Sequence, residues 1–172
     1  LIGLSALVVR LFFFLQFQES PFFTHPFSDS LLYVRWAEAI VSGTTSSDAW
    51  FLSPLYAYLL AGVRMLFGDL HASMRVFQIL MGTLAIALLH RIMLRRVAPL
   101  AAGLMALVAA LYPPFVFHDS MILTESLTVD LMIVLLWFWL NQEQRTTPGF
   151  LILGGTVLGL LVVMRTVFFV PA

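Results

Sequence analysis

The sequence predicts an all-α protein, a polytopic bundle of about five transmembrane helices with two further helices at the membrane surface. Of its 172 residues, 61% are hydrophobic and only 10% are charged, and the mean hydropathy is +0.99. A soluble domain of this size does not need so much apolar surface, so we expect an integral membrane protein. Zero net charge gives no indication of nucleic acid binding, and the absence of cysteine excludes disulfides and thiolate metal sites.

Five apolar runs are long enough to cross a bilayer, for which roughly 20 residues are needed and about 17 to 25 are tolerated. The chain begins without Met inside one apolar run and stops at the end of another, so we interpret it as the N-terminal part of a longer protein. The predicted spans cover residues 1–17, 72–92, 97–112, 121–140 and 149–167.

Residues 18–71 are too rich in acids and prolines to form one span, so we expect a long outer loop that carries two short helices. The first is predicted at about 30–42, with Ser28 or Asp29 as its cap and Gly43 at its end. Its polar residues follow i, i+3, i+7 spacing, which is typical of a helix lying at an interface; they are Arg35, Glu38 and Ser42. The second short helix is predicted at 55–67, with Ser53 as cap and Pro54 in its first turn.

Arginines in two connections predict the orientation. Arg91, Arg95 and Arg96 follow the second span, Arg145 follows the fourth, and these two connections lie on the same side. Short loops rich in arginine are cytoplasmic, so the long first loop and residues 113–120 are expected to face outward.

Asp29 and Glu125 are the two acids that this topology places near the outer face, although they are 96 positions apart. An acid just inside a span is costly and is usually functional or paired. Each acid also has a structural interpretation that stays open: Asp29 as the cap of the helix that follows it, and Glu125 as the partner of a nearby arginine. Asp130 lies deeper in the same span.

Arginines within spans have two interpretations here. Arg10 and Arg165 either extend to the membrane interface or hold a lipid phosphate in the fork of the guanidinium. His118 beside Asp119 resembles half of a metal site, but no further ligands stand at suitable spacing. We therefore predict no metal ligands and no cofactor, and leave a divalent metal open.

Four stretches, taken together, resemble the GT-C superfamily of membrane glycosyltransferases, in particular protein O-mannosyltransferases and bacterial lipid A aminoarabinose transferases. The second of them is similar to the family's "PPLY…LFG" helix. The first stretch is Pro26–Tyr33 with Ala37 and Ser42–Gly43, and the second is Ser53–Leu60 with Leu66–Asp69. The third is Arg75–Gly82 with the arginines to Arg96. The fourth is Leu111–Pro114 with Leu123–Glu125, and it continues through Gly159–Leu160 and Met164–Arg165 to Pro171.

The resemblance implies a sugar donor carried on a polyprenyl phosphate and an acceptor hydroxyl on a glycolipid, a glycan or a protein. Asp29 matches the first-loop acid, which implies a general base, and Glu125 matches the second acid of the outer cavity, where many relatives have Asp. Arg165 matches a basic position near the carrier phosphate. The implied transfer is inverting, and the implied location is the bacterial inner membrane with the site facing the periplasm. Substrate or carrier-phosphate contact is also expected of Arg10, Tyr56, His118 and Asp119.

Two other functions compete with this hypothesis. In a transporter or permease, acids within the membrane would relay protons, with Asp130 the best candidate. In a non-catalytic membrane subunit, the acids would pair with arginines and could be replaced together with them. Release of polyprenyl phosphate from a lipid-linked sugar separates the transferase from both.

Overall fold

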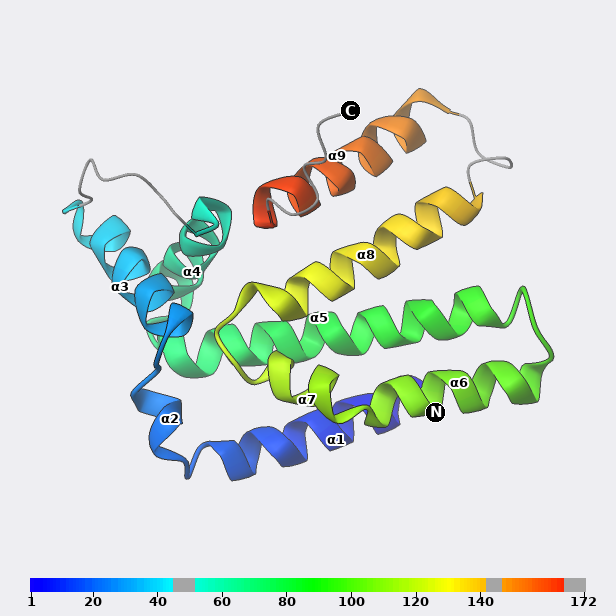
Figure 1. Ribbon diagram of the computed structural model, residues 1–172, viewed down its shortest axis with the longest axis horizontal. Helices are drawn as coiled ribbons and strands as arrows, with labels where there is room; N and C mark the ends of the chain where they lie inside the picture. Colours follow the sequence, from blue (N-terminus) through cyan, green and yellow to red (C-terminus); the bar gives the residue numbers. More distant parts are fainter. Residues whose placement is uncertain (45–51, 142–146, 166–172) are drawn as a thin grey trace.

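The computed structural model describes residues 1–44, 52–141 and 147–165 (Figure 1). In these ranges every regular element is an α-helix and there is no strand, which confirms the predicted class. The helices are α1 (Ile2–Phe17), α2 (Pro21–Thr24), α3 (Asp29–Ser42), α4 (Pro54–Phe67), α5 (Leu70–Met93), α6 (Pro99–Leu111), α7 (Pro113–Asp119), α8 (Thr124–Asn141) and α9 (Pro148–Met164).

The long helices lie lengthwise beside one another, and the two helices of the first loop gather at one end (Figure 1). Helix α5 is central, because it packs on α1, α6 and α8, and α8 in turn packs on α9. One end of the bundle contains α3, α4, the start of α8 and the end of α9, and we call it the α3–α4 end. The opposite end, where α5 stops and α6 begins, is called the arginine end.

Two helices, α5 and α8, are long and apolar enough to cross a membrane. Two bent pairs, α1 with α2–α3 and α6 with α7, raise the number of candidate spans in the described residues to four if each pair is one span. The fifth predicted span corresponds to α9, an apolar helix of 17 residues that ends at Met164, with Arg165 in an extended conformation. Residues 166 and 167 of the predicted span lie outside the described residues. The count of five spans stays a prediction.

The two short helices of the first loop form close to the predicted residues, but their caps differ. Helix α3 includes Asp29 as its first residue, and its N-cap, Ser28, makes no side-chain capping bond. Gly43 ends the helix in the left-handed conformation, with φ +69°, as predicted. The predicted polar stripe of Arg35, Glu38 and Ser42 is exposed.

Residues 113–120, predicted as a loop, instead contain helix α7. Its start has a physical reason, because Pro113 and Pro114 stand in the first turn, where a missing N–H costs nothing. The helix ends at Asp119 and returns the chain to the start of α8.

A buried cluster joins α3, α4, α5 and the start of α8, and thereby fixes the α3–α4 end. Tyr33 and Tyr56 meet edge to face, with ring centroids 4.7 Å apart, a favourable geometry for aromatic pairs. Leu60, Met74 and Ile122 are fully buried around them. The apolar face of α3 is therefore held against the bundle while its polar stripe stays exposed.

Gly82 of α5 lets the carboxylate of Asp119 approach the helix. A Cβ added at Gly82 would lie 2.5 Å from Oδ2 of Asp119. We expect Gly82→Ala to lower the stability of the full-length protein by about 1–3 kcal/mol, the usual cost of overpacking, measured as a fall in melting temperature in detergent.

Gly103→Ala on α6 is the matched control, because in the described part of the chain nothing beyond the local helix backbone lies within 4 Å of its added Cβ. Its melting temperature should equal the wild-type value or exceed it slightly, since alanine favours helix. Equal melting temperatures for the Gly82 and Gly103 variants would contradict the close approach of Asp119.

Candidate functional site

A pocket of about 260 Å³ opens at the α3–α4 end. Its walls come from four places far apart in the sequence: the starts of α3, α4 and α8, and the end of α9. The polar and charged residues that line it are Asp29, Tyr33, Ser53, Thr124, Glu125 and Arg165. The structure thus brings together the three residues that the sequence singled out as general base, second acid and phosphate ligand.

Asp29 lies at the rim of this pocket and is exposed. It accepts one long hydrogen bond, 3.5 Å, from the hydroxyl of Ser28, and within the described ranges no cation pairs with it. Its position in the first turn of α3 places the carboxylate near the positive end of the helix dipole, which stabilises its negative charge. The backbone of Asp29 is therefore held by helix α3, while its carboxylate is accessible to an incoming hydroxyl.

Glu125 and Arg165 form an ion pair, with 3.2 Å between Oε1 and Nη1. Both side chains stay partly accessible, at 32% and 44% exposure. The pairing is the structural interpretation left open for Glu125, and it also shows that Arg165 is turned toward the pocket. The second carboxylate oxygen of Glu125 is buried without a hydrogen-bond partner in the described part of the chain.

Hydrogen bonds between the first residues of α4 and two other helices hold the pocket wall. Ser53 is the N-cap residue of α4, as predicted, but its side chain makes no capping bond; its hydroxyl donates instead to the carbonyl of Val163, 3.0 Å away. Its backbone N–H donates to the hydroxyl of Tyr33 at 3.3 Å. Burial raises the pKa of the Tyr33 phenol, so this side chain stays protonated at neutral pH.

Sequence reasoning did not select Tyr33, Ser53 and Thr124 as site residues. Tyr33 stands four residues after Asp29, one turn along the same helix face, and Thr124 directly precedes Glu125. These two positions are the features of the sequence that could have indicated Tyr33 and Thr124. For Ser53 the sequence offers only its place before a proline, because its partner Val163 is 110 positions away.

Arg10 and Asp119 are paired with one another, and the substrate or carrier-phosphate contact expected of both stays a prediction. Nε of Arg10 lies 2.6 Å from Oδ2 of Asp119, and the side chains are only 1% and 4% exposed. Arg10 also donates to the carbonyls of Ala6 and Ala110, and Ser126 donates to Oδ1 of Asp119. Arg10 therefore neither extends to the interface nor faces the pocket.

Tyr56, whose expected substrate contact also stays a prediction, lies in the core behind the pocket. Its side chain is fully buried, and its hydroxyl donates to Oε1 of Gln78 at 3.1 Å. The amide nitrogen of Gln78 donates in turn to the carbonyl of Met121 at 2.9 Å. Tyr56 thus supports the turn before α8 and does not line the pocket.

His118 lines a neighbouring cavity of about 190 Å³ together with Asp119, Glu125 and Asp130. Its Nδ1 is buried without a partner among the described residues. Glu125 lines both this cavity and the pocket beside Asp29, so the two spaces meet at one side chain. His118 is adjacent to the candidate site but belongs to the inner cavity.

The comparison with known families supplies the class of protein. A family model described as dolichyl-phosphate-mannose-protein mannosyltransferase matches residues 49–172, well over half of the chain. The chain belongs to this mannosyltransferase family. No curated protein and no solved structure matches it.

Membership in the mannosyltransferase family makes this chain part of a membrane glycosyltransferase. The matched range contains Glu125 and Arg165 and begins after Asp29. Asp29 is thus tied to the family region by the pocket that it shares with Glu125 and Arg165. Across the described ranges of this mannosyltransferase chain, no group of three His, Asp or Glu side chains could hold a metal ion.

Proposed function

We propose that this chain forms the site at which a membrane glycosyltransferase moves a sugar from a polyprenyl-phosphate carrier to an acceptor hydroxyl. The observation that carries the proposal is the meeting of Asp29, Glu125 and Arg165 around one pocket, from three elements. The acceptor is a glycolipid, a glycan or a protein. The arginines at the opposite end favour an outward-facing pocket, on the periplasmic side of a bacterial inner membrane.

In this proposal Asp29 is the general base. The acceptor oxygen attacks the anomeric carbon as Asp29 takes the hydroxyl proton, the bond from that carbon to the phosphate oxygen breaks, and the carrier leaves as polyprenyl phosphate. One displacement inverts the anomeric carbon. An exposed carboxylate that has no paired cation among the described residues suits this role, because it can come within hydrogen-bond reach of the acceptor.

Arg165 is proposed to bind the carrier phosphate, with Glu125 holding the guanidinium in place. A guanidinium has five N–H donors in a rigid fork, and Arg165 gives one of its nitrogens to Glu125. The remaining donors can stabilise the charge that develops on the leaving phosphate. Glu125 then acts through Arg165, as a positioning residue.

An apolar groove beside the pocket supports a lipid carrier. This groove, of about 440 Å³, lies between α4, α5, α8 and α9, and its lining is almost wholly aliphatic and aromatic. Met164 lines both the groove and the pocket, so the two are adjacent. A prenyl chain lying in the groove would place its phosphate at Arg165.

The test is transfer by the purified full-length protein in liposomes, supplied with a panel of polyprenyl-phosphate-linked sugars that includes mannose, and with a membrane extract as the acceptor pool. The wild type should release polyprenyl phosphate. Arg165→Gln should lower the rate by about 10²–10³-fold, as expected for loss of one preorganised donor to a developing anion.

Arg35→Gln is the control, because Arg35 is exposed on α3 and does not line the pocket. It should transfer at the wild-type rate. Absence of release by the wild type would overturn the transferase and favour a transporter or a non-catalytic subunit. Equal rates for wild type and Arg165→Gln would overturn the phosphate contact alone.

A further inference from the structure

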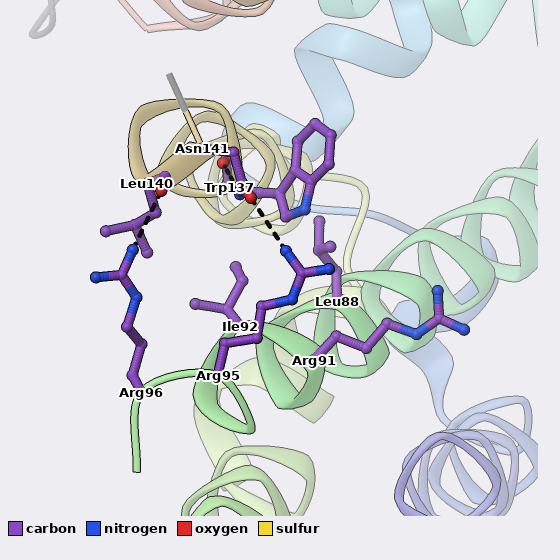
Figure 2. Close-up of a pocket in the computed structure, with 8 residues that line it drawn as sticks. All are labelled: Leu88, Arg91, Ile92, Arg95, Arg96, Trp137, Leu140 and Asn141. Atoms are coloured by element: carbon purple, nitrogen blue, oxygen red, sulfur yellow. Dashed lines mark hydrogen bonds between the residues drawn. The ribbon is translucent and has the colours of Figure 1, made fainter. Parts of the chain in front are cut away.

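A second pocket, of about 510 Å³, lies at the arginine end of the bundle (Figure 2). Among the residues that the structure describes, none that lines this pocket is acidic. Three are arginines, Arg91, Arg95 and Arg96, from the last turn of α5 and the residues after it. The others are Leu88, Ile92, Trp137, Leu140 and Asn141.

Two of the arginines fasten the end of α5 to the end of α8. Nη1 of Arg95 donates to Oδ1 of Asn141, and Nη2 of Arg96 donates to the carbonyl of Leu140, both at 3.1 Å. Figure 2 shows these two side chains reaching toward α8, while Arg91 extends away from them. Arg91 is exposed and makes no hydrogen bond or ion pair in the described part of the chain.

Holding α5 to α8 uses only a small part of the hydrogen-bonding capacity of these arginines. Each guanidinium has five N–H donors, and Arg95 and Arg96 each give a single one to α8. The bonds also join arginine to neutral partners, an amide oxygen and a carbonyl, so within the described residues no acid pairs with these positive charges. Three like charges around one pocket repel one another, and an anion bound there would relieve that repulsion.

The lining also has an apolar part. Leu88 and Ile92 stand on α5 one turn apart, and the Trp137 ring lies across from them on α8 (Figure 2). A free inorganic anion makes no favourable contact with such an apolar surface. A lipid does, because its phosphate can bind the guanidinium groups while its glycerol and acyl carbons lie against leucine, isoleucine and tryptophan.

We propose that this pocket binds the phosphodiester headgroup of an anionic lipid from the leaflet at the arginine end. Arginine suits this ligand because its planar fork matches phosphate oxygens. Basic pockets between transmembrane helices recognise such headgroups, and the cytoplasmic leaflet is the anionic one. The site lies at the other end of the bundle from Asp29, so it does not depend on the proposed transfer reaction.

Native mass spectrometry of the full-length protein in detergent tests this site, with phosphatidylglycerol and phosphatidylcholine as probes at equal concentration. The wild type should retain at least fivefold more phosphatidylglycerol. The double variant Arg95→Gln, Arg96→Gln should lose most of this preference. Arg91→Glu breaks no described bond and should reduce the preference at least threefold through charge alone.

Arg35→Glu is the matched control, since it makes the same charge change on an exposed arginine at the α3–α4 end. It should keep the wild-type preference. Equal retention of the two lipids by the wild type, or an undiminished preference in the folded Arg91→Glu variant, would overturn the proposal. Displacement of phosphatidylglycerol by millimolar inorganic phosphate would show a free-anion site and overturn the lipid assignment.

Discussion

Asp29→Asn in the full-length protein is expected to reduce sugar transfer by about 10²–10⁴-fold, the usual contribution of a positioned general base. Asparagine keeps the shape of the side chain but cannot take the proton of the acceptor hydroxyl. Because Asp29 is exposed and its side chain makes a single, long hydrogen bond to the described part of the chain, membrane insertion and melting temperature should stay at wild-type values. The measurement is the rate of polyprenyl phosphate release at saturating donor.

Glu19→Gln is the control for this prediction. Glu19 is an exposed acid in the same outer segment, and it does not line the pocket. Its variant should transfer at the wild-type rate, which separates loss of the base from a general loss of negative charge. If Asp29→Asn kept a third or more of the wild-type rate, Asp29 would not be the base.

The helices of the bundle could be predicted closely from the sequence. Helix α5 occupies Leu70–Met93 where residues 72–92 were expected, and α4 occupies Pro54–Phe67 where residues 55–67 were expected. The reason is physical: the bilayer fixes the length of an apolar run, and proline and glycine mark where a helix starts and stops. Helix α7 was not predicted, because its seven residues are too few to show a helical periodicity of apolar residues.

The convergence of Asp29, Glu125 and Arg165 was also predictable, because the order of the spans places all three at one end. The side-chain pairs were not. Arg10 and Asp119 are 109 positions apart, and their contact depends on how α1 is rotated against α5 and on the path of α7. Hydropathy shows that a residue lies within a span but not which neighbour it faces.

The buried Arg10–Asp119 pair should have the largest effect on stability. Asp119→Asn is expected to lower the free energy of unfolding by about 3–5 kcal/mol, because it leaves the Arg10 guanidinium buried without a counter-charge. Arginine cannot escape this cost by deprotonation. Reversible unfolding of the full-length protein in mixed micelles measures the change.

Two comparisons separate the pair from other effects. Glu38→Gln breaks the exposed ion pair with Arg64, 3.1 Å long, and should cost less than about 1 kcal/mol. The double variant Arg10→Met, Asp119→Leu removes both charges and should be more stable than Asp119→Asn, since no unpaired charge is left buried. If Asp119→Asn were as mild as Glu38→Gln, the pair would not hold α1 to α7; if the double variant were less stable than Asp119→Asn, charge compensation would not be the cause of the loss.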